Sequence, residues 1–208
     1  MNFSFCITTD YSDINRLNEV IESIHDLNIP RYEINIIGGI DSNEESNFVS
    51  YIYFNEKQKP GWITKKKNIL QKYSKYENLV YLHDYYVFDK DWYKSFVEFG
   101  NDWDICSNQQ LLITGQRHFT DWVTWDDPVF PRYTALPYDE WSRTENMYVS
   151  GGYFLVKKPV VMNNPFNEEL MHGQSEDVEW SLRVRDKYVM KCNGDAIVKH
   201  NKWHRDAK

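Results

Sequence analysis

The 208-residue sequence predicts an α/β fold in which a mainly parallel central sheet is flanked by helices. Two observations indicate this fold. Short apolar runs that are typical of buried strands alternate with segments whose apolar residues recur at helical spacing. In addition, polar clusters directly follow several of these strands. Ligands of parallel sheets bind beyond the carboxyl ends of the strands, so the clusters predict a shared site.

The first strand is predicted over residues 3–8, an apolar run that ends in the polar cluster Thr8-Thr9-Asp10. Asp13 can cap the helix that follows, from residue 14 to about residue 27. This pair of elements begins a β-α-β unit. The apolar positions of the helix are Leu17, Val20, Ile21, Ile24 and Leu27.

Further strands are predicted over residues 32–39, 49–54 and 79–82. The first of these breaks at Gly38-Gly39, and the last runs directly into His83-Asp84. Between the last two lies a basic helix, from residue 63 to about residue 76, which follows Pro60-Gly61. These polar strand ends, together with residues 8–10, are expected to share one site.

The second half of the chain predicts a helix over residues 89–99 and a strand region over residues 106–114. Residues 115–146 are irregular and rich in Trp, Pro and Asp. A strand over residues 148–156, a helix over 177–185 and a short strand over 196–198 complete the pattern. A long segment without regular structure is often functional, which draws attention to residues 115–146.

The composition limits the classes of function. A formal net charge of -7 argues against nonspecific binding to nucleic acid or to anionic membranes, although a local basic patch could still bind a diphosphate. No apolar run approaches the length of a membrane span and the N-terminus does not resemble a leader, so we expect a cytoplasmic protein without membrane insertion. Three widely spaced cysteines argue against a disulfide framework or a Cys-based zinc site.

Glu176 and Asp177 are adjacent carboxylates that follow a glycine-containing turn at the start of a predicted helix. A general base at this place could face a cleft. The alternative is a pair of acids that only stabilises the helix N-terminus. About 25 residues earlier, Gly151-Gly152-Tyr153 would let the backbone and an aromatic ring approach a ligand closely.

Together these two segments resemble the C-terminal half of the β-1,4-galactosyltransferase-like families, which carry a Gly-Gly segment and then a Gly-Gly-Glu-Asp motif. The resemblance implies a GT-A-like fold and an inverting glycosyltransferase that uses a UDP-sugar donor. It implies that Asp177 is the base that deprotonates the acceptor hydroxyl, and that Glu176 binds the acceptor or supports the turn. Gly151, Gly152 and Tyr153 would then lie at the donor sugar.

His83-Asp84-Tyr85-Tyr86 follows a strand at the position where GT-A enzymes carry an Asp-x-Asp that binds a divalent metal. The segment resembles that motif, with Asp84 retained and Tyr86 in place of the second acid. The resemblance implies Mn²⁺ or Mg²⁺, with His200 rather than His204 as a further ligand. A single carboxylate is a weak ligand set for a hard cation, so a site in which metal is dispensable and Asp84 is a turn residue remains the alternative.

The resemblance also implies a set of nucleotide contacts. Thr8, Thr9 and Asp10 occupy the position that holds uracil and ribose in related folds, and the Lys65-Lys66-Lys67-Asn68 segment is similar to the Ala-Arg-Asn element of family 2 transferases. Lysines in such a run can equally face solvent. Of the remaining candidates, Gly39 and Asp41 lie at the end of the strand predicted over residues 32–39, and His83, Asp84 and Tyr85 follow the strand predicted over residues 79–82. The full predicted set is Thr8, Thr9, Asp10, Gly39, Asp41, Lys65, Lys67, Asn68, His83, Asp84 and Tyr85.

Trp122 and Trp125 lie in the irregular segment, where indole rings could stack on a glycan acceptor or pin the loop to the body of the protein. We therefore expect one domain over residues 1–208, with a nucleotide-binding half at 1–100 and an acceptor-binding half that carries the base at 101–208. A noncatalytic nucleotide- or sugar-binding module on the same fold is the alternative function. A zinc hydrolase is disfavoured, because no His-Glu-x-x-His pattern occurs.

Overall fold

The structure is a computed structural model that describes residues 1–39 and 47–202. Asp41, a predicted nucleotide contact, lies outside the described residues, as does His204. Within the described part, no helix is long and apolar enough to cross a membrane.

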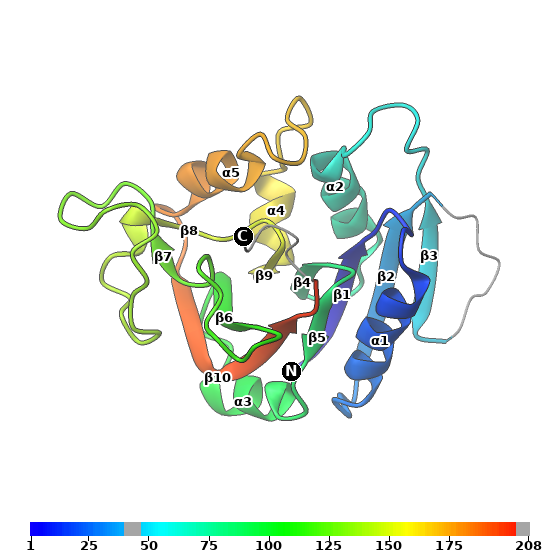
Figure 1. Ribbon diagram of the computed structural model, residues 1–208, viewed down its shortest axis with the longest axis horizontal. Coiled ribbons are helices and arrows are strands. Elements are labelled where there is room, and N and C mark those ends of the chain that lie inside the picture. The colour runs from blue at the N-terminus through cyan, green and yellow to red at the C-terminus, as the bar shows by residue number, and fades with distance from the viewer. Residues whose placement is uncertain (40–46, 203–208) are drawn as a thin grey trace.

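An eight-stranded sheet runs through the molecule in the order β3-β2-β1-β4-β9-β6-β10-β5 (Figure 1). Four of its contacts are parallel: β1 with β2 and β4, β2 with β3, and β6 with β10. The strand β9 is antiparallel to β4 and β6, and β5 is antiparallel to β10. The strands are β1 (Phe3–Thr8), β2 (Tyr32–Gly38), β3 (Val49–Tyr53), β4 (Asn78–His83), β5 (Tyr86–Phe88), β6 (Ile105–Leu112), β9 (Tyr153–Lys157) and β10 (Met190–His200).

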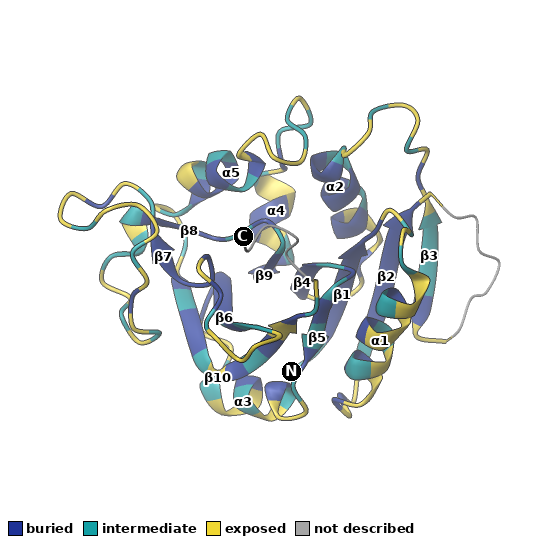
Figure 2. Ribbon diagram, in the orientation of Figure 1, coloured by how far each residue is buried: buried dark blue, intermediate teal, exposed yellow. Residues whose placement is uncertain are grey.

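Helices cover both faces of this sheet, so the predicted fold class is confirmed (Figure 1). One face carries α1 (Ile14–His25) and α3 (Trp92–Phe99), and the other carries α2 (Ile63–Tyr73), α4 (Lys158–Asn163) and α5 (Glu176–Val184). Successive residues of a strand point to opposite faces, so Phe5 of β1 packs with α1 and α3 while Cys6 packs with α2. The strands between the two helical layers are largely buried (Figure 2).

The predicted strand over residues 148–156 is two strands. β8 (Met147–Tyr148) pairs with the short β7 (Val123–Thr124) in a separate sheet, whereas β9 joins the central sheet. A turn over Gly151-Gly152 separates them, closed by a hydrogen bond from the Tyr153 amide to the Ser150 carbonyl at 3.2 Å. The chain therefore changes sheets at the two glycines.

Other boundaries differ for local reasons. β10 is far longer than predicted, because Asn193-Gly194-Asp195 interrupts its apolar pattern and its register against β6 shifts there. The three-residue β5 was not predicted, and neither was α4, which opens on Lys158-Pro159. The helix predicted over residues 89–99 begins at Trp92, and the one predicted over 63–76 ends at Tyr73. Short elements give little periodicity to detect.

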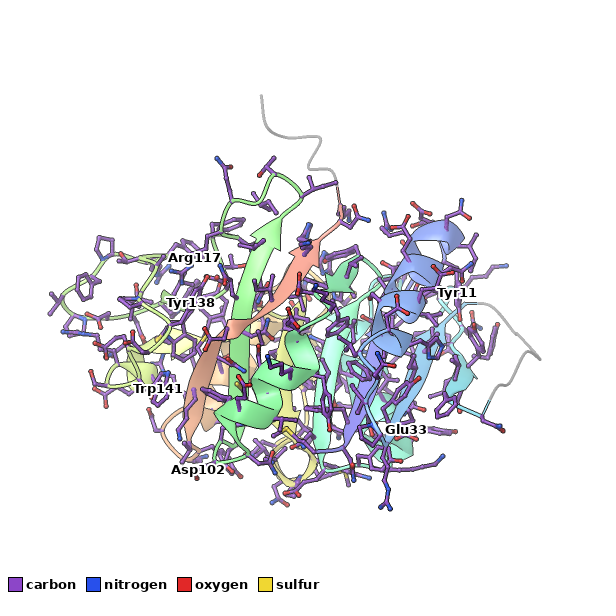
Figure 3. The ribbon with its side chains drawn as sticks, turned by 90° about the horizontal axis from the view of Figure 1, so that it is seen from below. Tyr11, Glu33, Asp102, Arg117, Tyr138 and Trp141 are labelled. Carbon is purple, nitrogen blue, oxygen red and sulfur yellow. The ribbon has the colours of Figure 1, made fainter. Side chains whose placement is uncertain are left out.

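Residues 113–146 form loops at the end of the sheet away from β3, apart from β7 and the short 3-10 helix η1 (Thr144–Asn146). Figure 3 places Arg117 and Tyr138 next to each other in these loops, at the opposite end of the molecule from Tyr11. The guanidinium carbon of Arg117 lies 4.2 Å from the centre of the Tyr138 ring, and both side chains bind the buried carboxylate of Asp121. The loops are thus packed around a polar centre of their own.

Candidate functional site

Two neighbouring cavities lie beyond the carboxyl ends of the parallel strands. The first, of about 210 Å³, opens where β1 and β4 end, because the strand register sets Thr8 beside His83. The second, of about 350 Å³, lies under the Gly151-Gly152 turn. The two cavities share a wall made of His83, Tyr85 and His172. The first is lined by Thr8, Thr9, Asp10, Ser12, Arg16, Gly61, Ile63, Lys66, His83, Asp84, Tyr85, His172 and Lys202.

Hydrogen bonds tie the strand ends of the first cavity together. The Thr9 hydroxyl donates to Asp84 Oδ2 at 2.5 Å and accepts a hydrogen bond from the Tyr11 amide at 2.9 Å. Arg16 Nε donates to the Asp84 carbonyl at 3.2 Å, and its terminal nitrogen lies 3.7 Å from Asp84 Oδ1. Burial raises the pKa of the Asp84 carboxyl, and the Thr9 hydroxyl and Arg16 oppose that rise. Asp84 is therefore a buried carboxylate that accepts a hydrogen bond from Thr9 and pairs with Arg16.

Two cations that line this cavity, Arg16 and Lys66, are not in the predicted set of nucleotide contacts. Arg16 reaches it from the first turn of α1, and Lys66 reaches it from α2. Lys66 Nζ donates to the Thr9 carbonyl at 3.0 Å and also pairs with Glu56. The signal for Arg16 was its place three residues after the helix cap Asp13, and the signal for Lys66 was its place inside the basic run.

Three predicted nucleotide contacts line neither cavity. Lys65 Nζ pairs with Glu168 at 2.7 Å, and the Asn68 side chain bonds the backbone of Phe166 in both directions at 2.9 Å. Both residues thus hold the segment that follows α4. Gly39 lies at the end of β2 near Glu56, outside the cavity walls.

Lys67, also predicted as a nucleotide contact, is buried and lines neither cavity. Its ammonium donates to the Gly151 carbonyl at 2.8 Å and lies over the rings of Phe154 and Phe166. Burial lowers the pKa of Lys67, while the charges of Glu176 and Asp177 raise it. Lys67 therefore supports the Gly151-Gly152 turn.

The residues around Asp84 do not fit the divalent cation that the resemblance implied. Asp84 already bonds Thr9 and pairs with Arg16, and the Tyr86 phenol is buried next to Gly152 with its pKa raised by burial. His200 lines the second cavity and not the first, with its ring 4.6 Å from that of Tyr85. Among residues 1–39 and 47–202, no three His, Cys, Asp or Glu side chains form a group that could hold a metal.

Asp177 is held in the second cavity at the start of α5. Its Oδ2 accepts a hydrogen bond from the Gly151 amide at 2.8 Å, and its Oδ1 accepts one from the Val178 amide at 2.9 Å. Ser175, which precedes the helix, has φ of 57°, a left-handed conformation that turns the chain sharply into α5. Glu176 is buried next to Gly151. The two predicted carboxylates and the predicted glycine turn thus meet in one place.

The two glycines are needed for this contact. A Cβ atom on Gly151 would lie 3.0 Å from Asp177 Cβ, and one on Gly152 would lie 3.1 Å from the Tyr86 hydroxyl. Any side chain there would displace the carboxylate or the tyrosine. Gly151 and Gly152 therefore let the turn lie directly against α5 and β5.

Two of the aromatic residues predicted to contact a sugar, Tyr153 and Trp122, are buried. Tyr153 faces the core, where its hydroxyl donates to Asn108 at 2.7 Å. Trp122 is also buried, with its indole N–H donating to the Glu140 carbonyl at 3.2 Å. Burial of both rings offsets the cost of ordering the chain around them, so they act as core residues.

Trp125 does line the second cavity, together with the aromatic residues Phe119, Tyr133 and Tyr148. Its ring centre lies 5.8 Å from that of Tyr133 and 5.4 Å from that of Tyr148, and Phe119 lies 6.3 Å from Tyr133. Phe119 and Tyr133 are well exposed. These four rings, Phe119, Trp125, Tyr133 and Tyr148, form an aromatic wall facing the same cavity as Asp177.

The fold is similar to that of solved glycosyltransferases. The S. aureus TarS 1-349 structure superposes with a TM-score of 0.67 at 15% identity, covering 97% of this chain and 60% of that one. TarS 1-349 in complex with UDP-GlcNAc gives 0.65 at 14%, covering 98% and 60%. GalNAc-T7 with UDP, GalNAc and Mn²⁺ gives 0.73 at 14%, covering 98% and 44%.

These likenesses show that the chain has the GT-A fold, as the sequence resemblance implied. The chain spans 60% or less of the length of these three proteins as solved. No protein-family model matches the chain, and a comparison with curated proteins finds no match.

Proposed function

We propose that this protein transfers a sugar from a UDP-sugar donor to a hydroxyl group of a glycan acceptor, with inversion at the anomeric carbon. The observation that carries the proposal is the position of Asp177, which is held by the Gly151 amide in a cavity that adjoins the cavity at the strand ends. The likeness to TarS in complex with UDP-GlcNAc supports the choice of donor.

In this proposal the first cavity binds the nucleotide. Thr8, Thr9 and Asp10 end β1 at this cavity, and His83, Asp84 and Tyr85 come from the end of β4. Hydroxyl and carboxylate groups at the ends of parallel strands suit the ribose and base, and the Arg16 and Lys66 cations suit the diphosphate. The shared wall of His83, Tyr85 and His172 then marks where the diphosphate ends and the sugar begins.

The second cavity binds the sugar and the acceptor. Gly151 and Gly152 line this cavity beside Asp177, where the donor sugar would lie, and the aromatic wall offers faces on which an acceptor sugar can stack. Glu176 is buried beside Gly151, where it can hydrogen-bond an acceptor hydroxyl or hold the turn. The acceptor hydroxyl would lie within reach of Asp177.

The chemical step then uses Asp177 as general base. As the acceptor oxygen attacks the anomeric carbon, its proton passes to a carboxylate oxygen of Asp177, and the bond from that carbon to the β-phosphate oxygen breaks with its electron pair staying on UDP. Attack from the side opposite to UDP inverts the configuration. Positioning and proton removal together account for roughly two to four orders of magnitude of such a rate.

The manganese or magnesium ion that the resemblance implied takes no part in this proposal, because the side chains around Asp84 do not form a set of ligands for it.

Calorimetric titration with UDP, GDP and CDP tests nucleotide binding, and turnover of UDP-sugars tests the reaction. Selective UDP binding with release of UDP from a UDP-sugar supports the proposal. Sugar binding without any nucleotide binding or turnover would instead identify a noncatalytic sugar-binding module.

A further inference from the structure

The first cavity presents cations and lacks the second acid of the Asp-x-Asp motif. Tyr86 stands at the place of that acid, and its hydroxyl is buried against Gly152 rather than turned to the first cavity. Asp84, the acid that remains, is bonded to Thr9 and paired with Arg16. A hard divalent cation needs several free oxygen ligands, and these residues do not supply them.

Arg16 and Lys66 enter the same cavity from different elements. Arg16 comes from α1 and is anchored by the Asp84 carbonyl, and Lys66 comes from α2 and is anchored by the Thr9 carbonyl. Their side chains are 18% and 7% exposed, so their geometry is fixed by packing rather than by solvent. A cation that is held in place before the ligand arrives loses little entropy on binding it.

Cationic side chains gather at this cavity. Arg16, Lys66 and Lys202 line it together with the two carboxylates Asp10 and Asp84, while Asp13 pairs with Arg16 and Glu56 pairs with Lys66 from outside the lining. Three cations on one cavity are a local feature in a protein of net charge -7. Cations grouped in a partly enclosed cavity can bind anions such as phosphates.

We propose that Arg16 and Lys66 bind the donor diphosphate directly and neutralise the departing UDP, in place of a divalent cation. This inference rests on the proposed function. When the bond between the anomeric carbon and the β-phosphate oxygen breaks, its electron pair stays on that oxygen, and the acceptor proton passes to Asp177. The planar guanidinium can donate two parallel hydrogen bonds to phosphate oxygens, and the ammonium adds a compact charge.

GalNAc-T7, whose structure was solved with UDP and Mn²⁺, has a similar fold. The proposed difference therefore lies in the side chains that line the first cavity and not in the architecture. The same fold can position either a metal or two side-chain cations at the diphosphate, since function depends on the site rather than on the fold.

The test is calorimetric titration of the full chain with UDP and with UMP, in EDTA and then with added Mn²⁺. We expect UDP to bind in EDTA with an affinity that Mn²⁺ changes by less than about twofold. Arg16→Gln and Lys66→Gln should each weaken UDP binding by about 10- to 100-fold and UMP binding much less, because only UDP carries the second phosphate. Arg16→Lys should recover part of the loss.

The controls separate binding from folding. Lys65→Gln removes a lysine of the same helix that pairs with Glu168 outside the cavities, and it should leave UDP binding unchanged. Loss of Arg16 leaves the buried Asp84 charge without its ion pair, so the thermal unfolding midpoint of Arg16→Gln is compared with that of the wild type, and a UDP defect at an unchanged midpoint is not a defect of folding.

Two results would overturn the inference while leaving the proposed function in place: UDP binding that EDTA abolishes and Mn²⁺ restores, or UDP binding that Arg16→Gln leaves intact. A wild-type protein that binds no UDP in either condition would overturn both the inference and the proposed function.

Discussion

Lys67 Nζ donates a 2.8 Å hydrogen bond to the carbonyl oxygen of Gly151, a residue that lies 84 positions further along the chain. The amide of the same glycine donates to Asp177 Oδ2, also at 2.8 Å. One residue of the turn thus connects a buried ammonium of α2 to the proposed base on α5. The orientation of Asp177 therefore depends on Lys67, although this lysine lines neither cavity.

Replacing Lys67 with methionine should impair catalysis without impairing nucleotide binding. Methionine fills similar space but cannot bond the Gly151 carbonyl, so the turn and Asp177 lose their fixed position. Misplacement of about 1 Å can lower kcat by roughly 100-fold. Steady-state kinetics and UDP calorimetry measure the two effects separately. Lys65→Met on the same helix is the control, and equal loss in both variants would contradict this role.

Asp177→Asn should lower the rate of sugar transfer by about two to four orders of magnitude while UDP still binds. The amide side chain keeps an oxygen that can accept from Gly151, but it cannot take a proton from the acceptor. Glu179→Gln is the matched control, because Glu179 lies on the same helix and pairs with Arg183 outside the cavities. Normal transfer by the Asp177→Asn variant would remove Asp177 from the role of base.

Gly151→Ala should reproduce much of the Asp177→Asn defect. Its new methyl group would lie 3.0 Å from Asp177 Cβ and 3.3 Å from the nearest oxygen of Glu176, so the turn and α5 must move apart. We expect a reduced kcat with a thermal midpoint only slightly lower, since overpacking typically costs about 1–3 kcal/mol. Comparison of kcat with the unfolding midpoint checks this, and wild-type kcat would show that the close contact is dispensable.

Trp125→Ala should weaken binding of the acceptor more than binding of the donor. Trp125 is part of the aromatic wall facing Asp177, so its removal should raise the acceptor KM by roughly 5- to 10-fold and leave hydrolysis of the donor by water unchanged. The control is Trp141→Ala, which removes an indole that packs on Phe99 and lines neither cavity. Equal effects of the two variants on the acceptor KM would argue against the wall as an acceptor site.

Stability should fall in alkaline solution. Burial raises the pKa of Tyr81, Tyr86 and Tyr153 well above 10.0, and that of Cys6 from 9.0 to about 12. Above about pH 9 the unfolded chain loses these protons while the folded chain keeps them, so the free energy of unfolding falls as pH rises. Each group contributes about 1.4 kcal/mol per pH unit above its unfolded pKa. Urea unfolding at about pH 8 and about pH 10.5 measures the change.

Lys67 acts in the opposite direction, because burial lowers its pKa and the folded chain releases its proton first. Lys67→Met should therefore make the alkaline fall in stability steeper. An unfolding midpoint that stays constant or rises between the two pH values would contradict the predicted contribution of the buried tyrosines and cysteine.

The sequence by itself determined the α/β class and the elements with strong periodicity. The strand Phe3–Thr8, the helix capped by Asp13 and the polar strand ends could be predicted because strand alternation, helix capping and strand-end polarity are local properties. The motif resemblance also implied that Gly151-Gly152 and Glu176-Asp177 serve one site, and in the structure the Gly151 amide bonds Asp177.

Only the tertiary structure decided which side chains face a cavity. Within the run of lysines on α2, Lys65 turns to Glu168, Lys66 to the first cavity and Lys67 to Gly151, because a helix rotates about 100° at each residue and different neighbours surround it. The sequence alone could not tell which of these three lysines faces the first cavity. Packing likewise placed Trp122 in the core and Trp125 in the cavity wall, since burial depends on the elements that close over each ring.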